Sequence, residues 1–365
     1  MKTIGLLLFV LYSGQWARAD IYCRDENNNP IDWYVFYKLP KLKSSSVPSL
    51  KAGNGYMFIT SASLEKGWQF STNTIDDKSS LLRQTLPFLK NPQQQVLWFV
   101  YNDQGDAICP SCGHTKGVIA GDKSGGIWLI HSIPKLLDGN YPRSGLKFGQ
   151  SALCISLSRE QLDSVGDLLA YNTPNFQRSN IINDLKSLYP KIMAAYQKVK
   201  VKEPWSLEKT ISTLNGTNLK AFAKARRFSS DLYEWVAKSL ETTLYVETWI
   251  NDAHPLPSNC SIKFRVINVQ SVIIPQLNVQ FSSHSDHSKI AISDSGSKPW
   301  VCVGDINRTL SQERRGGGTV CLNNTKLWNS YQSLINLPLM SLNHAKKSRT
   351  EDSSHLHPRR KNRNG

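Results

Sequence analysis

An internal repeat constrains the fold of this chain more than any other feature of its sequence. The motif His114-Thr115-Lys116 in the first half corresponds to His287-Ser288-Lys289 in the second. Each motif is followed by an aspartate, glycine and a tryptophan: Asp122, Gly125-Gly126 and Trp128 in the first copy, and Asp294, Gly296 and Trp300 in the second. The aspartate precedes the tryptophan by six positions in both copies. Each copy is typical of a strand, a Gly/Ser turn and a returning strand, with His and Lys on one face. The repeat therefore predicts two related halves whose motifs point into one shared cleft.

The rest of the chain has strand-like runs in both halves, with helical patterns between them. Aromatic and β-branched residues predict strands over residues 33–37, 96–101, 126–130, 153–157 and 300–303. Apolar periodicity predicts helices over residues 181–199 and 222–240. We therefore expect a mixed α/β (α+β) fold, with an N-terminal half over residues 20–200 and a C-terminal half over residues 201–340, each containing a sheet with flanking helices.

The two ends of the chain differ from the rest. Lys2 precedes an apolar run over residues 4–12, and Ala17-Arg18-Ala19 fits a cleavage site, so residues 1–19 are predicted to be a signal peptide. No stretch reaches the roughly 20 apolar residues that a membrane-spanning helix needs. Residues 341–365 are basic and almost free of apolar side chains, which predicts a disordered tail. We expect a soluble protein, secreted or lysosomal, without membrane insertion.

The net charge indicates the kind of partner. Lys and Arg outnumber Asp and Glu by 44 to 28, and the isoelectric point is about 9.5. This surplus favours a polyanionic partner, either a nucleic acid such as DNA or an anionic membrane surface. The charge alone does not distinguish the two.

Seven cysteines in an exported chain are expected to be mostly oxidised, with one thiol left over. Four Asn-x-Ser/Thr sequons also suit the secretory pathway, at Asn215, Asn259, Asn307 and Asn323. Cys302 and Cys321 flank a turn-rich segment that a disulfide could close. Cys109 and Cys112 fit a tight disulfide, a redox pair or half of a zinc site. The sequence has no second CxxC or histidine ladder to complete a zinc site, so no metal is expected.

Two His-x-Lys units that face each other supply the groups needed to cleave a phosphodiester without metal or cofactor. One imidazole attacks phosphorus, the other protonates the leaving oxygen, and the lysines offset the charge on the non-bridging oxygens. The reaction is then a double displacement through a phosphohistidine. Because one histidine must be neutral and the other protonated, an acidic optimum is expected. The candidate catalytic residues are His114, Lys116, His287 and Lys289.

Other polar residues near the motifs have more than one interpretation. Asn307 fits a phosphate ligand, in which case its sequon would not be glycosylated. His131 follows a strongly apolar strand, so a core histidine and a cleft residue are equally supported. Asp294 has the spacing of an orienting carboxylate, but residues 294–297 fit a hairpin turn better. Residues 314–319 fit a phosphate-cradling loop and a flexible turn equally.

A series of motifs runs in order along nearly the whole mature chain. It includes Cys23-Arg24-Asp25-Glu26, Gly113-His114-Thr115-Lys116-Gly117, Trp128-Leu129-Ile130-His131-Ser132, Gly149-Gln150-Ser151-Ala152-Leu153-Cys154, Asp286-His287-Ser288-Lys289 and Cys302-Val303-Gly304-Asp305-Ile306-Asn307-Arg308. With these motifs the chain resembles the deoxyribonuclease II family. The resemblance implies a phospholipase D-like pseudodimer that cuts double-stranded DNA at acid pH without a divalent cation and leaves 3′-phosphate ends.

The resemblance also implies roles for particular residues. His287 corresponds to the usual active-site histidine of the family, with His114, Lys116 and Lys289 as the remaining catalytic core. His131 is implied as a supporting cleft histidine, and Asn307 and Asp305 as substrate-binding residues. The implied disulfides are Cys23–Cys154 and Cys302–Cys321.

Three features depart from the family pattern. Ile290-Ala291 replaces a common Trp-Cys, which alters the packing beneath His287. The basic tail replaces a cysteine that looks like the partner of Cys260, so Cys260 is expected to be free or paired with Cys109 or Cys112. The CxxC pair beside His114 is itself a departure.

Two other classes of function compete with a DNA hydrolase. A phospholipase D-type lipid hydrolase would use the same histidines, but should carry an apolar rim or an amphipathic helix for membrane docking, and the sequence has no convincing example. A DNA-binding or toxin-like protein without catalysis would keep the positive charge and lose a His or Lys of the pair. All four are present, which favours the enzyme. One chain supplies both halves of the site, and a homodimer remains open.

Overall fold

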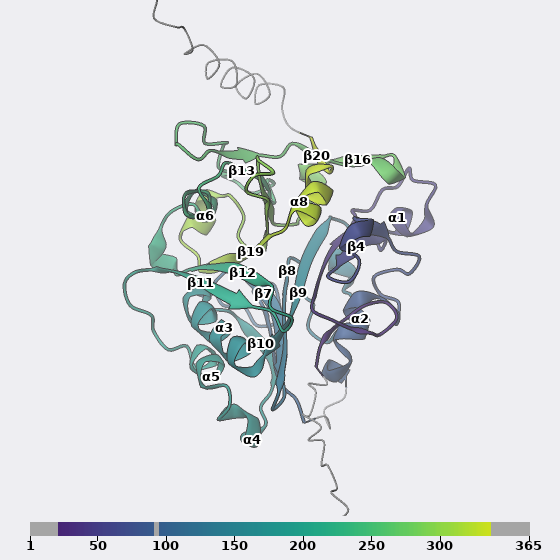
Figure 1. The fold of residues 1–365 in the computed structure, drawn as a ribbon. Helices are drawn as coiled ribbons and strands as arrows, with labels where there is room; N and C mark the ends of the chain where they lie inside the picture. The colour runs from purple at the N-terminus through teal and green to yellow at the C-terminus, as the bar shows by residue number, and fades with distance from the viewer. Residues whose placement is uncertain (1–20, 91–94, 337–365) are drawn as a thin grey trace, which may run out of the picture.

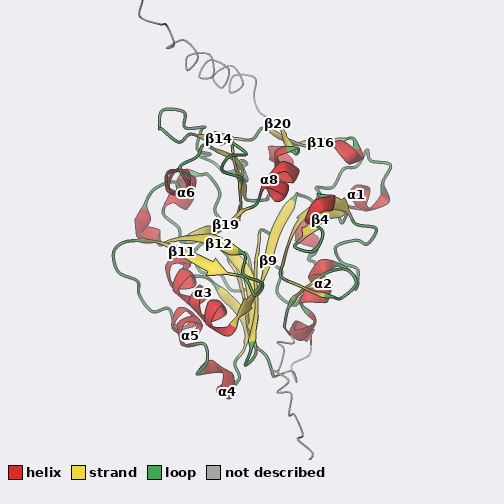
Figure 2. Ribbon diagram, viewed as in Figure 1, coloured by secondary structure: helices red, strands yellow, loops and turns green. Residues whose placement is uncertain are grey.

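The computed structural model describes residues 21–90 and 95–336. The expected signal peptide, residues 1–19, and the expected basic tail, residues 341–365, lie outside the described residues. Two large sheets and the helices around them form a mixed α/β protein, as predicted (Figures 1 and 2). No helix in the described ranges has the length and apolar character needed to cross a membrane.

The first sheet has eight strands in the order β10-β6-β7-β8-β9-β3-β4-β5. Every neighbouring pair in it is antiparallel. Its strands are β3 (Trp33–Lys38), β4 (Tyr56–Thr60), β5 (Gln69–Phe70), β6 (Leu97–Asn102), β7 (Lys116–Gly121), β8 (Gly125–His131), β9 (Gln150–Ser158) and β10 (Phe176–Asn180). The four strands predicted in this half are confirmed.

The second sheet has seven strands in the order β11-β12-β19-β18-β17-β13-β14. Its strands are β11 (Ser206–Ser212), β12 (Asn218–Lys224), β13 (Leu244–Glu247), β14 (Val266–Asn268), β17 (Ile290–Ser293), β18 (Trp300–Gly304) and β19 (Gly317–Asn323). The strand predicted over residues 300–303 is confirmed as β18. Two small sheets complete the set, with β1 (Cys23–Arg24) and β2 (Pro30–Ile31) in one, and β15 (Ser271–Ile274), β16 (Val279–Ser282) and β20 (Ile335–Asn336) in the other.

The helices are α1 (Pro48–Ala52), α2 (Leu81–Thr85), α3 (Arg159–Asn172), α4 (Asn183–Lys186), α5 (Pro190–Tyr196), α6 (Leu232–Leu240), α7 (Leu310–Glu313) and α8 (Thr325–Gln332). The single helix predicted over residues 181–199 is wrong, because Pro190 opens a new helix and α4 has already ended. The helix predicted over residues 222–240 is correct only for its second part. Residues 218–224 form β12, and α6 begins after Asp231, whose side chain accepts a hydrogen bond from the Tyr233 N–H at 2.9 Å.

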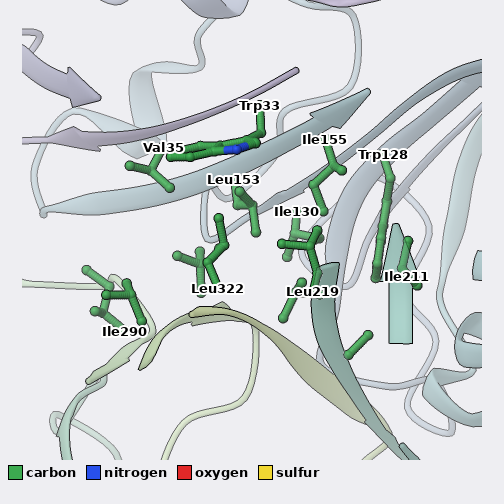
Figure 3. Packing of buried hydrophobic residues seen from close by; sticks show 14 of the residues in the cluster. Trp33, Val35, Trp128, Ile130, Leu153, Ile155, Ile211, Leu219, Ile290 and Leu322 are labelled. Atoms are coloured by element: carbon green, nitrogen blue, oxygen red, sulfur yellow. The ribbon is translucent and has the colours of Figure 1, made fainter. Parts of the chain in front are cut away.

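The main core lies between the two sheets, which face each other across one cluster of apolar side chains (Figure 3). In β3, Val35 belongs to this central cluster and Phe36 to a second cluster on the outer face of the first sheet. In β18, Val303 belongs to the central cluster and Cys302 to a third cluster, which β18 shares with α6. This alternation is the period of two that a strand between two apolar layers requires. Helix α3 packs against both sheets, and so joins the two halves.

Three disulfides hold the described chain: Cys23–Cys154, Cys302–Cys321 and Cys109–Cys112. The first two confirm the pairings that the family resemblance implied. The third resolves the CxxC pair as a disulfide, so its cysteines are not ligands of a zinc ion here. Cys260 is free and exposed, in agreement with one of the two expectations for it.

Candidate active site

The two repeat copies form equivalent four-stranded units. Strands β6-β7-β8-β9 and β13-β17-β18-β19 lie in the same order in their sheets. Gly117, which follows Lys116, pairs with Ile130. Ile290, which follows Lys289, pairs with Val303 in the same way. Lys116 and Lys289 are therefore equivalent positions, and the predicted hairpins are confirmed.

The tryptophans of the two copies are not equivalent, although their spacing in the sequence matches. Trp128 pairs with Ile119, whereas Val301 pairs with Ile292 in the second hairpin. Trp128 therefore corresponds to Val301, and Trp300 lies one position earlier. Because a shift of one residue reverses the face of a strand, Trp128 lies in the central cluster and Trp300 packs on the outer one.

Reciprocal hydrogen bonds bring the two motifs to the junction of the halves. The N–H of His114 donates to the carbonyl oxygen of Gly316 at 2.8 Å, and the N–H of His287 donates to that of Gly149 at 2.9 Å. Gly113 makes the first approach possible, because a Cβ there would lie 2.7 Å from the Gly316 carbonyl oxygen of the other half and 1.9 Å from that of Asn172. Each histidine is thus held by the backbone of the other half.

His114 lies beside a buried carboxylate that the sequence analysis did not identify. Its Nδ1 is 2.5 Å from the carbonyl oxygen of Asp305, and its Nε2 is 3.7 Å from Oδ2 of Asp103. The same carboxylate forms ion pairs with Lys116 and, at 3.3 Å, with Arg315. Asp103 therefore links three cationic or basic groups around the first motif.

His287 lies in a different environment. Its Nδ1 is 3.2 Å from the carbonyl oxygen of Ser132 and 3.3 Å from Oε1 of Gln150. Both partners accept hydrogen bonds, so we assign the proton to Nδ1 and the lone pair to Nε2. The ring of Trp249 lies 5.2 Å from the imidazole, between centroids. Lys289 Nζ donates to the carbonyl oxygen of His287 at 2.6 Å.

The charges of the two motifs act on each other across the junction. His114 and His287 are 6% and 8% exposed, so each keeps only an edge in contact with solvent. Burial, and less strongly Lys116 and Lys289, lowers the pKa of His114 to about 3, against the opposing effect of Asp103. Burial, Lys289, Lys116 and His114 together hold the pKa of His287 well below its ordinary value. Both imidazoles are therefore neutral in the free protein at neutral pH.

Burial and neighbouring charges also shift the pKa values of Asp103 and Lys289, with a different balance in each. Burial opposes ionisation of Asp103, but the charges of His114 and Lys116 outweigh it and hold the pKa of Asp103 below its usual range. Burial and the neighbouring Lys116 lower the pKa of Lys289 well below its ordinary value. Lys116 and Arg315 therefore surround the ionised carboxylate of Asp103, which lies against the first histidine.

His131 and Asn307 are buried, and each has one side-chain polar atom without a hydrogen-bond partner among the described residues. His131 Nδ1 accepts from the N–H of Ile133 at 3.1 Å, and its Nε2 has no hydrogen-bond partner among the described residues. Burial, followed by the charge of Lys116, lowers the pKa of His131 to about 3. Oδ1 of Asn307 also has no partner within the described part of the chain. Such buried, unsatisfied atoms are costly unless a ligand uses them.

Asp305 is engaged by protein groups on both sides. Its Oδ1 accepts from the N–H of Gly318 at 2.8 Å, while its carbonyl oxygen lies against His114. Burial raises the pKa of the Asp305 carboxyl to about 7. These contacts support a role for Asp305 in positioning His114.

Two further buried carboxyl groups lie behind His287. Oδ1 of Asp286 accepts from the N–H of Ser288 at 2.9 Å, and Tyr37 donates its hydroxyl to the same side chain. Oε2 of Glu247 accepts from the Ser283 hydroxyl at 2.5 Å. Burial, and then the charge of Asp286, raises the pKa of Glu247 well above its usual value.

Asp294 and residues 314–319 lie in the second half, near the ends of strands. Asp294 lies in a hairpin turn, as expected, and its Oδ1 accepts from the Thr242 hydroxyl at 3.1 Å. For residues 314–319, both the phosphate-cradling loop and the flexible turn are wrong from Gly317 onward, because that residue begins β19. Arg315 and Gly316 of this run reach the site, through contacts with Asp103 and His114.

The fold and the site define a class of protein. Two imidazoles and two buried lysine side chains, brought together by an internal repeat, can supply the acid–base and charge-stabilising groups of a phosphodiester-cleaving enzyme.

Comparison with known proteins identifies the family. Residues 22–337 match the family model described as Deoxyribonuclease II. Mouse deoxyribonuclease-2-beta is 33% identical over 348 residues, covering 92% of this chain and 96% of the relative. Plancitoxin-1 of Acanthaster planci is 33% identical over 328 residues, covering 86% and 91%. Deoxyribonuclease-2 of Caenorhabditis elegans is 31% identical over 368 residues, covering 91% and 97%. The chain belongs to the deoxyribonuclease II family, and membership places it among DNA-hydrolysing enzymes.

Proposed function

We propose that this protein is an acid endodeoxyribonuclease that cuts double-stranded DNA by a metal-independent, two-histidine mechanism and leaves 3′-phosphate ends. The observation that carries the proposal is the reciprocal anchoring of His114 and His287 at one junction, with the charges of both lysines acting on both imidazoles. Family membership supports DNA as the substrate, and the net charge of +16 suits a polyanion.

The contacts support different roles for the two histidines. His287 directs Nδ1 at carbonyl oxygens, which leaves the lone pair of Nε2 free, and its lowered pKa keeps the ring neutral. These are the properties of a nucleophile. The Nε2 of His114 faces Asp103, whose carboxylate stabilises an imidazolium. His114 is therefore the proton donor.

The reaction then proceeds in two balanced steps. Nε2 of His287 attacks phosphorus, the bond from phosphorus to the 5′-oxygen breaks, and His114 gives its proton to that oxygen. A water molecule then attacks the phosphohistidine, His114 accepts the proton from the water, and the phosphorus–nitrogen bond breaks. The phosphate remains on the 3′-oxygen, and both histidines return to their starting states.

Other residues assist the charge changes in these steps. Lys116 and Lys289 stabilise the non-bridging oxygens. The unpartnered Oδ1 of Asn307 and Nε2 of His131 support roles for these two residues as polar groups that contact the substrate. Asn307 is 4% exposed, which supports an unglycosylated sequon. For Asp305, expected from the sequence to bind substrate, the contacts favour positioning of His114.

The acid optimum follows from the pKa of the proton donor. Because burial lowers the pKa of His114 to about 3, the protonated form grows as the pH falls. A bound phosphate adds negative charge beside the imidazole and raises that pKa, so the donor is protonated in the complex at mildly acid pH. We propose a lysosomal or extracellular location, where such conditions or free DNA occur. The homodimer stays a prediction.

The proposal is tested by incubating the purified protein with supercoiled plasmid at acid pH in excess chelator. We expect nicking and linearisation that both His287→Ala and His114→Ala abolish. His254→Ala, a change at an exposed histidine, is the matched control and should keep full activity. The products should support primer extension only after phosphatase treatment.

Activity retained in both histidine variants would refute the mechanism. Dependence on an added divalent cation would refute its metal independence. Hydrolysis of phosphatidylcholine vesicles without DNA cleavage would select the lipid hydrolase in place of the nuclease.

A further inference from the structure

The two repeat units differ at one equivalent position beside the histidines. The residue before Asp103 pairs with Lys116. In the second unit, Glu247 of β13 pairs with Ile290 of β17. The next pair along these strands places Thr248, the residue before Trp249, opposite Lys289. Asp103 and Trp249 therefore occupy the same place in the two units. One histidine has a carboxylate beside it and the other has an indole ring.

The partners of these two residues are also equivalent. Val320 of β19 and Leu153 of β9 are equivalent, because they pair with equivalent residues of β18 and β8. Arg315 lies five residues before Val320, and Phe148 lies five residues before Leu153, so Arg315 and Phe148 are equivalent as well. Arg315 contacts Asp103 at 3.3 Å, and the ring of Phe148 contacts that of Trp249 at 4.6 Å between centroids. An ion pair on one side of the junction thus corresponds to an aromatic pair on the other.

The aromatic pair does not belong to the cores that hold the fold. Phe148 and Trp249 are half-buried, and neither is a member of the three apolar clusters or packs on them. Within residues 21–90 and 95–336, the two rings contact each other, His287 and Lys147, whose Nζ lies 4.8 Å from the centroid of Phe148. Large aromatic side chains gain most when fully packed, so this position calls for another explanation.

We propose that Phe148 and Trp249 form a subsite that stacks an unstacked nucleobase next to the scissile phosphate. The inference rests on the proposed function and extends it to the recognition of substrate. Aromatic faces stack any of the four bases, which suits a nuclease that reads little sequence. Lys147, exposed beside Phe148, is placed to meet a neighbouring phosphate.

The subsite takes the nucleotide that stays on phosphorus during the reaction. His287 attacks from the side opposite the departing 5′-oxygen, so the nucleotide joined through its 3′-oxygen remains attached to His287 in the covalent intermediate. Its base lies on the aromatic side of the junction. The leaving nucleotide departs on the side of Asp103 and Arg315, which present charge and no ring for stacking.

The test uses a 5′-labelled oligonucleotide duplex in which one residue is replaced by a stable tetrahydrofuran abasic analogue. The fragment ladder compares cleavage directly 3′ of that residue with cleavage at the same linkage of the intact duplex. In the wild-type enzyme we expect a drop of about 5- to 150-fold at this linkage, the range that base stacking on an aromatic side chain produces. Other linkages in the ladder act as internal standards.

Matched variants separate stacking from support of His287. Phe148→Leu keeps the apolar volume and removes the ring, so it should cut the intact duplex more slowly and lose the drop at the abasic residue. Phe148→Tyr should restore the drop. Trp205→Leu removes a half-buried tryptophan elsewhere, whose ring faces Arg227, and should leave the drop unchanged.

Equal cleavage beside the abasic and the normal residue in the wild-type enzyme would overturn the subsite. A uniform slowing by Phe148→Leu, with the drop intact, would assign the pair to positioning of His287 alone. Binding constants for intact and abasic oligonucleotides, measured at neutral pH in chelator, distinguish the proposed nucleobase subsite from the proposed catalytic function. An abasic penalty in binding that depends on Phe148, without any cleavage of DNA, would reject the catalytic function while supporting the subsite.

Discussion

The substitution Asp103→Asn tests the assignment of His114 as the proton donor. Oδ2 of Asp103 lies 3.7 Å from Nε2 of His114, and both side chains are buried. Two unit charges about 4 Å apart interact by about 4 kcal/mol at the effective dielectric that fits protein sites. At about 1.36 kcal/mol per tenfold change, loss of the carboxylate reduces the protonated population of His114 by about 100- to 1000-fold at a fixed pH. Cleavage at pH 5 should fall by a similar factor.

The pH dependence distinguishes this role from a structural one. Asp103 raises the pKa of His114, so the variant requires a lower pH to reach the same protonated fraction. Initial rates of plasmid nicking between pH 3 and pH 7 in chelator should therefore show the high-pH limb of the profile displaced to lower pH, with a smaller deficit at pH 3 than at pH 5. Asp167→Asn removes a half-exposed carboxylate that pairs with Lys191 at 2.8 Å, and serves as the control.

A loss of equal size at every pH would refute the reasoning, and so would an unchanged rate at pH 5. Removing one partner of a buried ion pair costs about 3–5 kcal/mol, because Lys116 and Arg315 then lose their shared counter-charge. Thermal melting by circular dichroism must accordingly show that the variant is folded at the assay temperature. A folded variant with a displaced limb supports the assignment.

Two further predictions concern stability. The buried carboxyl of Glu247 has a pKa well above its usual value, so the folded state keeps a proton that the unfolded chain releases, and stability falls as the pH rises through the folded pKa. Glu247→Gln should therefore raise the melting temperature relative to wild type more at pH 7.5 than at pH 4.5, and a difference that does not change with pH would contradict this. Cys23→Ser combined with Cys154→Ser removes a link between residues separated by 131 positions, and should lower the free energy of unfolding by about 5 kcal/mol in denaturant titrations. A loss below about 1 kcal/mol would show that the unfolded chain is not restrained by this bond.

The sequence predicts the parts of the fold that depend on local pattern. The hairpins after Lys116 and Lys289 follow from their turn residues and apolar alternation, and the structure contains both. The helix predicted over residues 222–240 begins inside β12, because this short strand, residues 218–224, is apolar on one side. Ala221 and Ala223 fill the central cluster with a period of two, which a short run does not distinguish from a helix.

The parts of the site that the sequence does not predict depend on how strands distant in the sequence pair with each other. Asp103 and Trp249 come to equivalent positions only because β6 pairs with β7 and β13 pairs with β17. Only a few of their neighbouring residues are alike, so the repeat is difficult to detect there in the sequence. The matched spacing of Trp128 and Trp300 is the converse case, because a similar pattern in the sequence corresponds to opposite faces in the fold.

The difference between Asp103 and Trp249 has a consequence for how such a protein can change over generations. In an assembly of two identical subunits, every substitution occurs twice, so both sides of a symmetric centre must carry the same side chains. A chain that contains both copies is free of that constraint, and one copy can specialise in proton transfer while the other specialises in holding a ring. Since each histidine is also hydrogen-bonded to the opposite copy, the two copies can diverge in chemistry while neither can be lost.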